Sequence, residues 1–155
     1  MKSELAKIKK LVYTVRKQRV MLDQHLAEIY GVQTRVVNQQ VKRNKNKFPE
    51  DFMFRLTKKE YDNLKSQNVT SGWGGRRTLP YAFTEFGAVQ LANVLRSKRA
   101  DEISVLVVRV FSELRNILAE NKSLKKHIER LEKEAAKKDK VIKTFYYVLN
   151  ELKKS

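Results

Sequence analysis

The chain has 155 residues, enough for one domain with an extension or for two small domains, and it contains no cysteine, which excludes disulfides, thiolate metal sites and thiol nucleophiles. Its 34 lysines and arginines outnumber its 17 aspartates and glutamates, and the net charge of +17 far exceeds the value of about 2–8 that suffices for solubility. This excess favours a polyanionic partner, nucleic acid first and an acidic membrane surface second, with a basic protein that has no anionic ligand as the simpler alternative.

The N-terminal residues 3–11 can form a short amphipathic helical segment with Leu5, Ile8 and Leu11 on one side. Charged residues in this stretch interrupt the apolar run that a signal peptide would need. Elsewhere no apolar run approaches the roughly 20 residues of a membrane-spanning helix. We therefore expect a cytoplasmic, nucleoid-associated protein without a membrane partner.

Residues 12–22 contain two apolar groups that flank a charged sequence at residues 16–19. This pattern predicts two short strands joined by a turn. Asp23 is then a suitable N-cap for a helix over residues 24–30, which Gly31 ends.

A second helix is predicted from Thr34 to Arg43, and residues 52–56 alternate between apolar and polar as a strand does. Thr57 and Glu60 have the spacing of a capping box, in which each side chain bonds the backbone N–H of the other residue. A helix is therefore predicted to begin at this point.

Residues 71–75 form a glycine-rich stretch that is typical of a hairpin tip or loop. Thr84 is a further predicted N-cap. In the helix that follows it, Ala88, Leu91 and Leu95 would form a buried stripe.

From about Asp101 onward the chain has neither glycine nor proline, and apolar residues recur at alternating steps of four and three. The helix could reach roughly 80 Å, too long for one element of a small domain, so its narrow seam is expected to pack against a second copy. Residues 103–118 are more broadly apolar and are expected to belong partly to the domain. The dimer-interface residues predicted from this pattern are Leu114, Ile117, Asn121, Leu124, Ile128, Leu131, Ile142, Phe145 and Leu149.

Asn121 occupies an a position of the heptad if Val107, Leu114 and Ile128 are also a positions. A buried asparagine at a pairs with its equivalent and favours a parallel, in-register dimer at a cost in stability. A parallel homodimer is therefore the favoured arrangement. Antiparallel pairing and pairing with a different protein remain as alternatives.

The segment from Leu26 to Asn44 has the pattern of a helix-turn-helix. Ala27 is small where two helices would cross, Gly31 can adopt the positive φ of the turn, and Val37 and Val41 would anchor the second helix. Two packed helices with a solvated polar face would produce the same pattern, but the charge of the chain favours a role in DNA binding.

Amide and cationic side chains lie on the outer face of this second helix, where they suit base edges and phosphates. Arg76 and Arg77 follow the glycine-rich tip and could lie along the DNA backbone or in the minor groove. Trp73 could insert into DNA, although such a residue more often covers an apolar edge of its own domain. The predicted DNA-binding residues are Thr34, Arg35, Asn38, Gln39, Lys42, Arg43, Lys45, Lys47, Trp73, Arg76 and Arg77.

Catalytic motifs are not found in the sequence. His25 and His127 belong to no metal-binding pattern, and there is neither a nucleophile elbow nor a phosphate-binding glycine loop. A magnesium cluster of Asp23, Glu28, Glu50 and Asp51 could be imagined, but capping and solvation are simpler roles for these residues. We expect no catalytic residues, no metal site, no cofactor and no enzymatic activity.

Several motifs follow one another at defined spacing: Val20-Met21-Leu22-Asp23, Leu26-Ala27 with Tyr30-Gly31-Val32, Asn38 with Val41, Arg43 and Asn44, Phe48-Pro49-Glu50-Asp51-Phe52-Met53-Phe54, Gly75-Arg76-Arg77, and Leu79-Pro80-Tyr81-Ala82-Phe83-Thr84-Glu85 with Gly87. Together they resemble the "ORF-six N-terminal" DNA-binding domain of bacteria and their phages, a family related to the KilA-N and Bro-N domains. The resemblance covers about residues 12–118. It implies a compact α+β DNA-binding domain, often found at the N-terminus of phage antirepressor-like or regulatory proteins. Such proteins often carry a second globular domain, where this sequence predicts only a coil.

The sequence thus predicts an α+β fold: a small winged-helix-like head with a helix-turn-helix and short strands, followed by a long C-terminal helix, beginning near residue 101, that forms a coiled coil. Residues 1–11 would be an N-terminal extension, residues 12–118 the head and residues 119–155 the dimerisation helix. The expected function is sequence-preferring binding of double-stranded DNA by a homodimeric bacterial or prophage transcriptional regulator of the antirepressor type. The alternative is an adaptor that captures a repressor protein or another partner through its coil.

Overall fold

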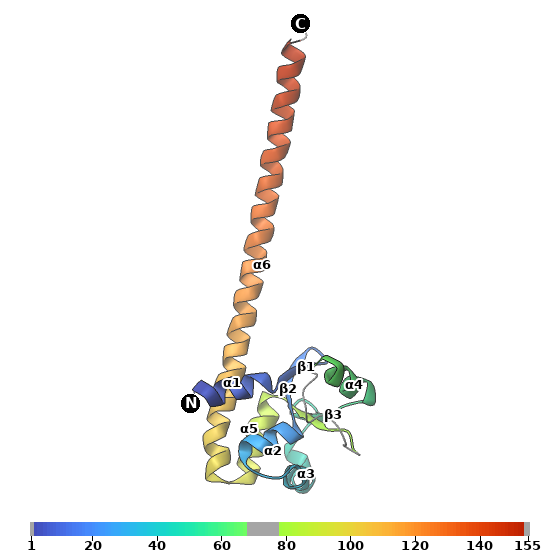
Figure 1. Ribbon diagram of the computed structural model, residues 1–155, viewed down its shortest axis with the longest axis vertical. Helices are drawn as coiled ribbons and strands as arrows, with labels where there is room; N and C mark the ends of the chain where they lie inside the picture. The colour runs from blue at the N-terminus through green and yellow to red at the C-terminus, as the bar shows by residue number, and fades with distance from the viewer. Residues whose placement is uncertain (1, 68–77, 154–155) are drawn as a thin grey trace. The chain divides into compact units, whose positions relative to one another are not determined.

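The computed structural model describes residues 2–67 and 78–153 and confirms the α+β class (Figure 1). A small antiparallel sheet is combined with helices, and the last helix is far longer than the others. Residue contacts divide the chain into Met1–Glu113, here called unit 1, and Leu114–Ser155, here called unit 2. No helix in the described part of the chain has the length and apolar character of a membrane span.

The elements follow one another in the order α1 (Lys2–Lys10), β1 (Val12–Val15), β2 (Gln18–Leu22), α2 (Asp23–Tyr30), α3 (Thr34–Arg43), the 3-10 turn η1 (Lys45–Lys47), β3 (Met53–Arg55), α4 (Lys58–Gln67), β4 (Tyr81–Phe83), α5 (Glu85–Leu95) and α6 (Lys98–Lys153). Most of these elements match the predicted ones within a few residues. The predicted loop at residues 71–75 lies outside the described residues.

The sheet has the strand order β1-β2-β4-β3, with each neighbouring pair antiparallel. β4 was not predicted, because three residues after a proline give too short a pattern to detect. It joins β2 to β3, pairing Met21 with Phe83 and Phe54 with Ala82. The sheet therefore brings together strands from distant parts of the sequence.

The predicted turn between β1 and β2 contains only two residues instead of four, since Gln18 and Arg19 belong to β2. Arg16 and Lys17 both have positive φ, at 54° and 63°. Two successive residues of this kind form the tight turn whose twist matches that of the adjoining strands. The charged stretch thus serves as a hairpin connection without glycine or asparagine.

Each face of the sheet packs against helices. On one face, Val20, Leu22 and Ala82 join a buried cluster with Tyr61 and Leu64 of α4. Because side chains alternate along a strand, Met21 and Phe83 lie on the opposite face, where both are fully buried and where α2 and α5 contact β2 and β4. The sheet therefore forms the layer between α4 and the helices that carry the candidate site.

The predicted capping box at the start of α4 is confirmed. The backbone N–H of Thr57 donates to Oε1 of Glu60 at 2.9 Å, and the N–H of Glu60 donates to Oγ1 of Thr57 at 3.2 Å. Glu60 also accepts a hydrogen bond from Nε of Arg16 at 2.9 Å, while the guanidinium lies 4.2 Å from the ring centroid of Phe54. One carboxylate thereby connects the β1–β2 turn to α4.

We predict that Glu60→Gln lowers stability at neutral pH and that its effect disappears in acid. The hydrogen bond from Arg16, with those involving Thr57, lowers the pKa of Glu60 from 4.5 to about 2. The stabilisation is therefore complete above pH 4.5 and is lost as the pH falls through about 2. Glutamine keeps the capping geometry, so the variant isolates the charge, and solvent screening limits the effect to about 0.5–1 kcal/mol. Urea unfolding of parent and variant over this pH range measures it; a difference that does not shrink in acid would contradict the assignment.

The start of α5 is fixed by close contact with the segment before β3. Thr84 is the predicted N-cap, and its Oγ1 accepts a hydrogen bond from the N–H of Gly87 at 3.5 Å and donates one to the carbonyl of Asp51 at 2.8 Å. A Cβ on Gly87 would lie 1.9 Å from the carbonyl oxygen of Phe52. Only glycine permits this approach, which sets the position of α5.

Gly87→Ala is predicted to destabilise the protein by about 1–3 kcal/mol, because either backbone segment must shift to admit the methyl group. Asn93→Ala is the matched control, since Asn93 is exposed on the same helix and alanine is a better helix former. Chemical denaturation of both variants tests the prediction. Equal stability of Gly87→Ala and the parent would show that the contact is not restrictive.

α6 begins at Lys98, three residues earlier than predicted, because Ser97 caps it: Oγ of Ser97 accepts from the N–H of Ala100 at 3.0 Å. Its first part, up to Glu113, belongs to unit 1, and the buried side chains there are Ala100, Ile103, Leu106, Val107, Val110 and Phe111. In unit 2, every described residue from Arg115 onward is exposed.

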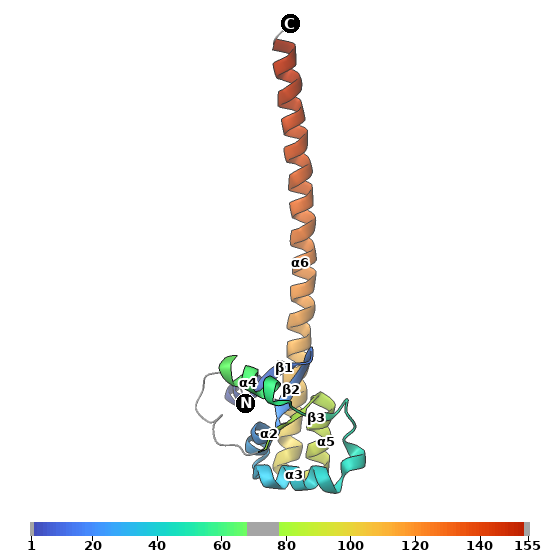
Figure 2. The ribbon, with the colours of Figure 1, turned by 90° about the vertical axis from the view of Figure 1, so that its right-hand side faces the viewer.

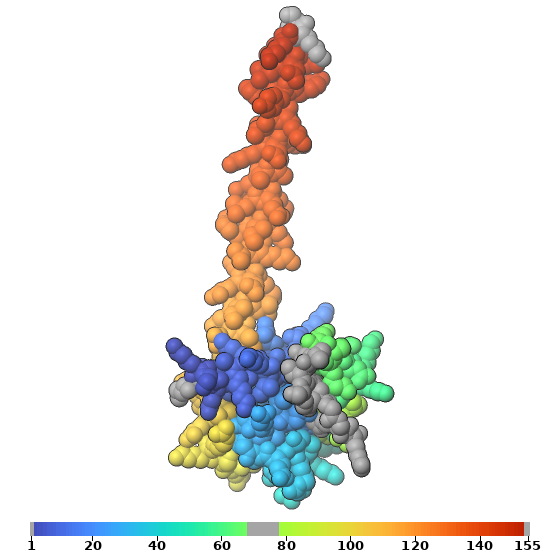
Figure 3. Space-filling model, in the orientation of Figure 1, coloured from blue at the N-terminus to red at the C-terminus, as the bar shows by residue number. Residues whose placement is uncertain are grey.

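α1 lies along the surface of unit 1 (Figure 3). Ile8 is only 1% exposed, Nζ of Lys7 lies 2.9 Å from a carboxylate oxygen of Glu28, and Nζ of Lys9 lies 2.7 Å from one of Glu113. The N-terminal segment is therefore a packed helix.

Candidate nucleic-acid interface

α2 and α3 form a packed helix pair joined by a three-residue turn. Gly31 adopts a φ of 74° at the end of α2, and the N–H of Val32 donates to the carbonyl of Ala27 at 2.9 Å. This left-handed residue closes α2 and redirects the chain into α3. Gly31 therefore has the positive φ that the sequence predicted, and Ala27 is buried.

α2 is held in place by two buried polar contacts. Asp23 is fully buried and is the first residue of α2, not the residue before it as predicted; its carboxylate accepts from the N–H of Gln24 at 2.7 Å and from that of Tyr81 in β4 at 3.2 Å. Tyr30 donates from its hydroxyl to the carbonyl of Ala88 in α5 at 2.7 Å, and burial strongly raises the pKa of this phenol. The two contacts fix α2 against β4 and α5, and α5 also contacts α3.

α3 is anchored by two valines four residues apart. Val37 and Val41 are 0% and 3% exposed, and α3 contacts both α2 and α5. Figures 1 and 2 show α3 at an edge of unit 1 with α2 and α5 on its inner side. Because the valines fix the rotation of the helix, its remaining side chains have defined directions.

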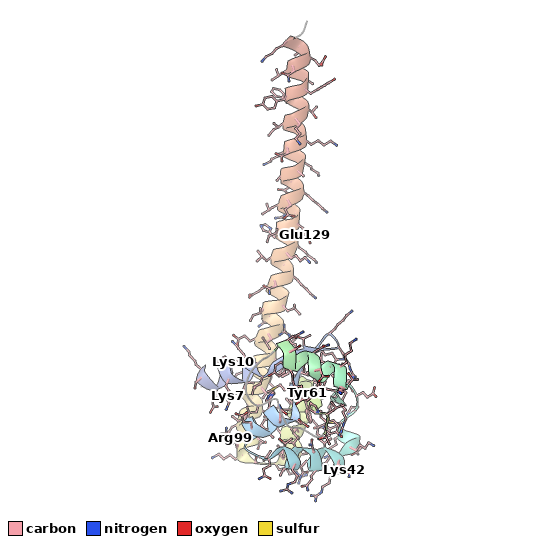
Figure 4. All side chains as sticks on the ribbon, turned by 45° about the vertical axis from the view of Figure 1, so that its right-hand side comes forward. Lys7, Lys10, Lys42, Tyr61, Arg99 and Glu129 are labelled. Atoms are coloured by element: carbon pink, nitrogen blue, oxygen red, sulfur yellow. The ribbon has the colours of Figure 1, made fainter. Side chains whose placement is uncertain are left out.

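The outer face of α3 carries four exposed polar side chains, Arg35, Gln39, Lys42 and Arg43. Lys42 lies at the outer surface of the helix (Figure 4). Lysine and arginine in the last turn also compensate the negative end of the helix dipole. The face therefore presents three cations and one amide to solvent.

The two other predicted residues of α3 are less accessible. Thr34 and Asn38 are half-buried, and Oδ1 of Asn38 is buried without a hydrogen-bond partner among the described residues. The amide oxygen of Asn38 can accept a hydrogen bond from a ligand only if the amide rotates away from the protein. The sequence alone placed it on the outer face because helical spacing does not reveal how close neighbouring helices come.

A second basic group follows α3 directly. Lys45 and Lys47 are exposed in η1, which is attached to the rest of unit 1 at both ends. Nδ2 of Asn44 donates to the carbonyl of Gln40 at 2.8 Å, and Nε2 of Gln90 in α5 donates to that of Lys47 at 3.3 Å. The two lysines thus extend the cationic surface of α3 on a supported loop.

Arg99 is a basic residue near this surface that sequence reasoning missed. Its side chain lies over the turn between α2 and α3: a Cβ built on Gly31 would be 2.9 Å from Cδ of Arg99 (Figure 4 labels Arg99). Arg99 is exposed and belongs to the first turns of α6. No local motif could have shown this proximity, because it arises from packing between distant segments.

The remaining predicted residues lie in or directly after the glycine-rich stretch and in the predicted dimer interface. Trp73, Arg76 and Arg77 lie outside the described residues, so their contacts with DNA stay a prediction. Leu114 is half-buried, and the other predicted dimer-interface residues, Asn121 included, are exposed along α6. Within residues 2–67 and 78–153, no group of three or more histidines and acidic residues could hold a metal ion.

Comparison of the chain with models of known protein families identifies one match. A model of the ORF6N domain matches residues 10–94, more than half of the chain, and includes the helix pair, all four strands and most of α5. No curated protein and no solved structure matches. The match agrees with the resemblance of the sequence motifs, but it ends at residue 94, whereas the resemblance was placed over about residues 12–118. The chain belongs to the ORF6N-domain family.

Proposed function

We propose that this protein is a regulator that binds double-stranded DNA, with α2 and α3 acting as a helix-turn-helix and α3 entering the major groove. The observation that carries this proposal is the division of α3 into two sides: Val37 and Val41 are buried, while Arg35, Gln39 and Lys42 face solvent. A helix anchored in this way can present a fixed set of donors to base edges. Membership of a family found in bacteria and phages supports a role in regulation.

The chemistry of the exposed side chains suggests which of them contact bases and which contact phosphates. Gln39 can bridge an adenine and Arg35 a guanine, and both lie in the N-terminal and central part of α3, which reads bases in helix-turn-helix proteins. Lys42, Arg43, Lys45 and Lys47 form a group that suits phosphates. Arg99 is close enough to the turn to hold a phosphate at the start of α3. Trp73, Arg76 and Arg77 would complete the interface as a wing.

The double substitution Lys42→Glu with Arg43→Glu is predicted to weaken binding to duplex DNA by about tenfold or more and to lower the salt dependence by about 0.9 for each phosphate that is no longer neutralised. The matched control is Lys58→Glu with Lys59→Glu, at exposed positions in the first turn of α4. Both variants change the net charge equally. Fluorescence anisotropy at several salt concentrations measures the affinities.

The comparison of the two variants separates a site from a general charge effect. If α3 is the interface, the α4 variant keeps most of its affinity. Equal losses in both variants would show that the net charge, and no particular surface, governs binding. An α3 variant with undiminished affinity at physiological salt would contradict the proposal.

The second part of the proposal is that two chains pair through α6 as a parallel coiled coil. Leu114, Ile117, Leu124, Ile128 and Leu131 recur at heptad spacing, and the last four are exposed on an isolated helix. Asn121 at an a position favours parallel, in-register pairing. Two heads paired in this way would bind half-sites in inverted repeat, about one turn of DNA or a multiple apart.

Leu124→Glu with Leu131→Glu is predicted to lower the average mass of the protein in solution, because it places charges in the apolar seam. The control, Ser123→Glu with Ala136→Glu, adds the same charge at exposed positions outside the seam and is expected to leave the mass unchanged. Sedimentation equilibrium measures both. A seam variant with the mass of the parent would contradict pairing through α6.

A further inference from the structure

The last three turns of α6 are far more apolar than the rest of unit 2. Between residues 141 and 152, eight large apolar side chains are exposed, among them Phe145 and Tyr146 at 62% and 63%. Lys143, Thr144, Asn150 and Glu151 are the other residues of the interval. We call this segment, residues 141–152, the tail.

The tail differs from the preceding helix in its heptad positions. Across residues 115–140 the positions that flank the seam are mostly charged, as at Glu120, Lys125 and Glu132. In the tail the corresponding positions are Val141, Tyr146 and Val148. The apolar face thus widens from two heptad positions to four.

A two-stranded coiled coil buries chiefly its a and d side chains. In the tail these are Ile142, Phe145, Leu149 and Leu152. Val141, Phe145 and Val148 line a shallow apolar hollow on one side of this seam. Pairing of two chains would therefore leave an apolar strip on each side of the tail, and exposed contiguous apolar surface of this kind marks an interaction site.

We infer that two coiled-coil pairs join through their tails, in antiparallel orientation, to form a four-helix contact; this inference rests on the paired state proposed above. A helix that is apolar at a, d, e and g can contact two neighbouring helices, as in a four-helix bundle. A helix that is apolar only at a and d contacts one. The occupant of the tail surface is accordingly a second pair of the same chain. The contact continues the seam without a break.

Charge selects the orientation. Residues 115–140 contain nine lysines and arginines and five acidic residues. In a parallel tetramer these basic stretches would lie side by side along their length, and the basic unit 1 segments would gather at one end. Antiparallel association overlaps only the tails, so the basic stretches stay apart. The charged flanks before residue 141 also prevent the four-helix contact from extending further.

The functional consequence is that one tetramer holds two DNA sites. Each coiled pair supplies two α3 helices, and the antiparallel contact directs the two pairs to opposite ends. The protein would then connect two duplexes, or two sites on one duplex, through a contact that contains no DNA-binding residue.

Val141→Glu with Val148→Glu tests this inference in the full chain, because both positions lie outside the a and d seam. The parent is expected to have four times the chain mass of 18.2 kDa by sedimentation equilibrium, and the variant half the mass of the parent. Lys143→Glu changes the net charge by the same amount on the polar strip and is expected to keep the mass of the parent. Small-angle scattering is expected to give the parent a greater maximum dimension than the variant.

DNA bridging provides the second readout. Parent protein is expected to retain a labelled duplex on beads that carry a different duplex, and the Val141→Glu, Val148→Glu variant to lose this retention while binding a single duplex as tightly as the parent. A parent that is only dimeric, a variant with the parent's mass, or equal maximum dimensions would overturn the inference. Absence of single-duplex binding by the parent, or a parent that is monomeric, would overturn the proposed function instead.

Discussion

The burial of Val37 and Val41 is the interaction on which the candidate site depends. Two β-branched side chains four residues apart fix the rotation of α3, and everything its outer face can do follows from that rotation. The neighbours that bury them are fixed by polar contacts at some distance, such as the Asp23 carboxylate on β4 and the Tyr30 hydroxyl on α5. The close approach of Gly87 to Phe52 sets α5 itself. The position of the cationic surface of α3 therefore depends on packing contacts that begin in the sheet.

Local signals in the sequence were sufficient for elements whose stabilising contacts are local. The capping box of α4, the N-cap at Thr84 and the glycine after α2 involve residues three or four apart, and each was found from spacing alone. β4 was missed because its stability comes from two neighbouring strands instead of its own three residues. The position of Arg99 over Gly31 and the burial of the Asn38 oxygen are likewise tertiary effects. Residue types therefore indicated a candidate site, and packing decided which of these side chains are exposed there.

α6 combines three chemical patterns within one uninterrupted helix. Its first turns bury Ile103, Val107 and Phe111 in unit 1, and the middle part keeps a narrow seam between charged flanks. The tail then becomes apolar over most of its circumference. The period of the apolar residues hardly changes along the helix, so a search for heptads alone registers a single seam. The three parts differ in the width of the apolar face. This width determines how many neighbouring helices α6 can pack against.

The dependence of unit 1 on the start of α6 has a consequence for biosynthesis. The strands and the α2–α3 pair are translated well before Ile103, Val107, Val110 and Phe111, which complete the buried interior. A nascent chain on the ribosome consequently cannot close this interior until the codons for those residues have been read and the segment has left the exit tunnel. The codons for residues 115–153 are read afterwards and encode exposed helix, so unit 1 needs none of these residues to complete its interior.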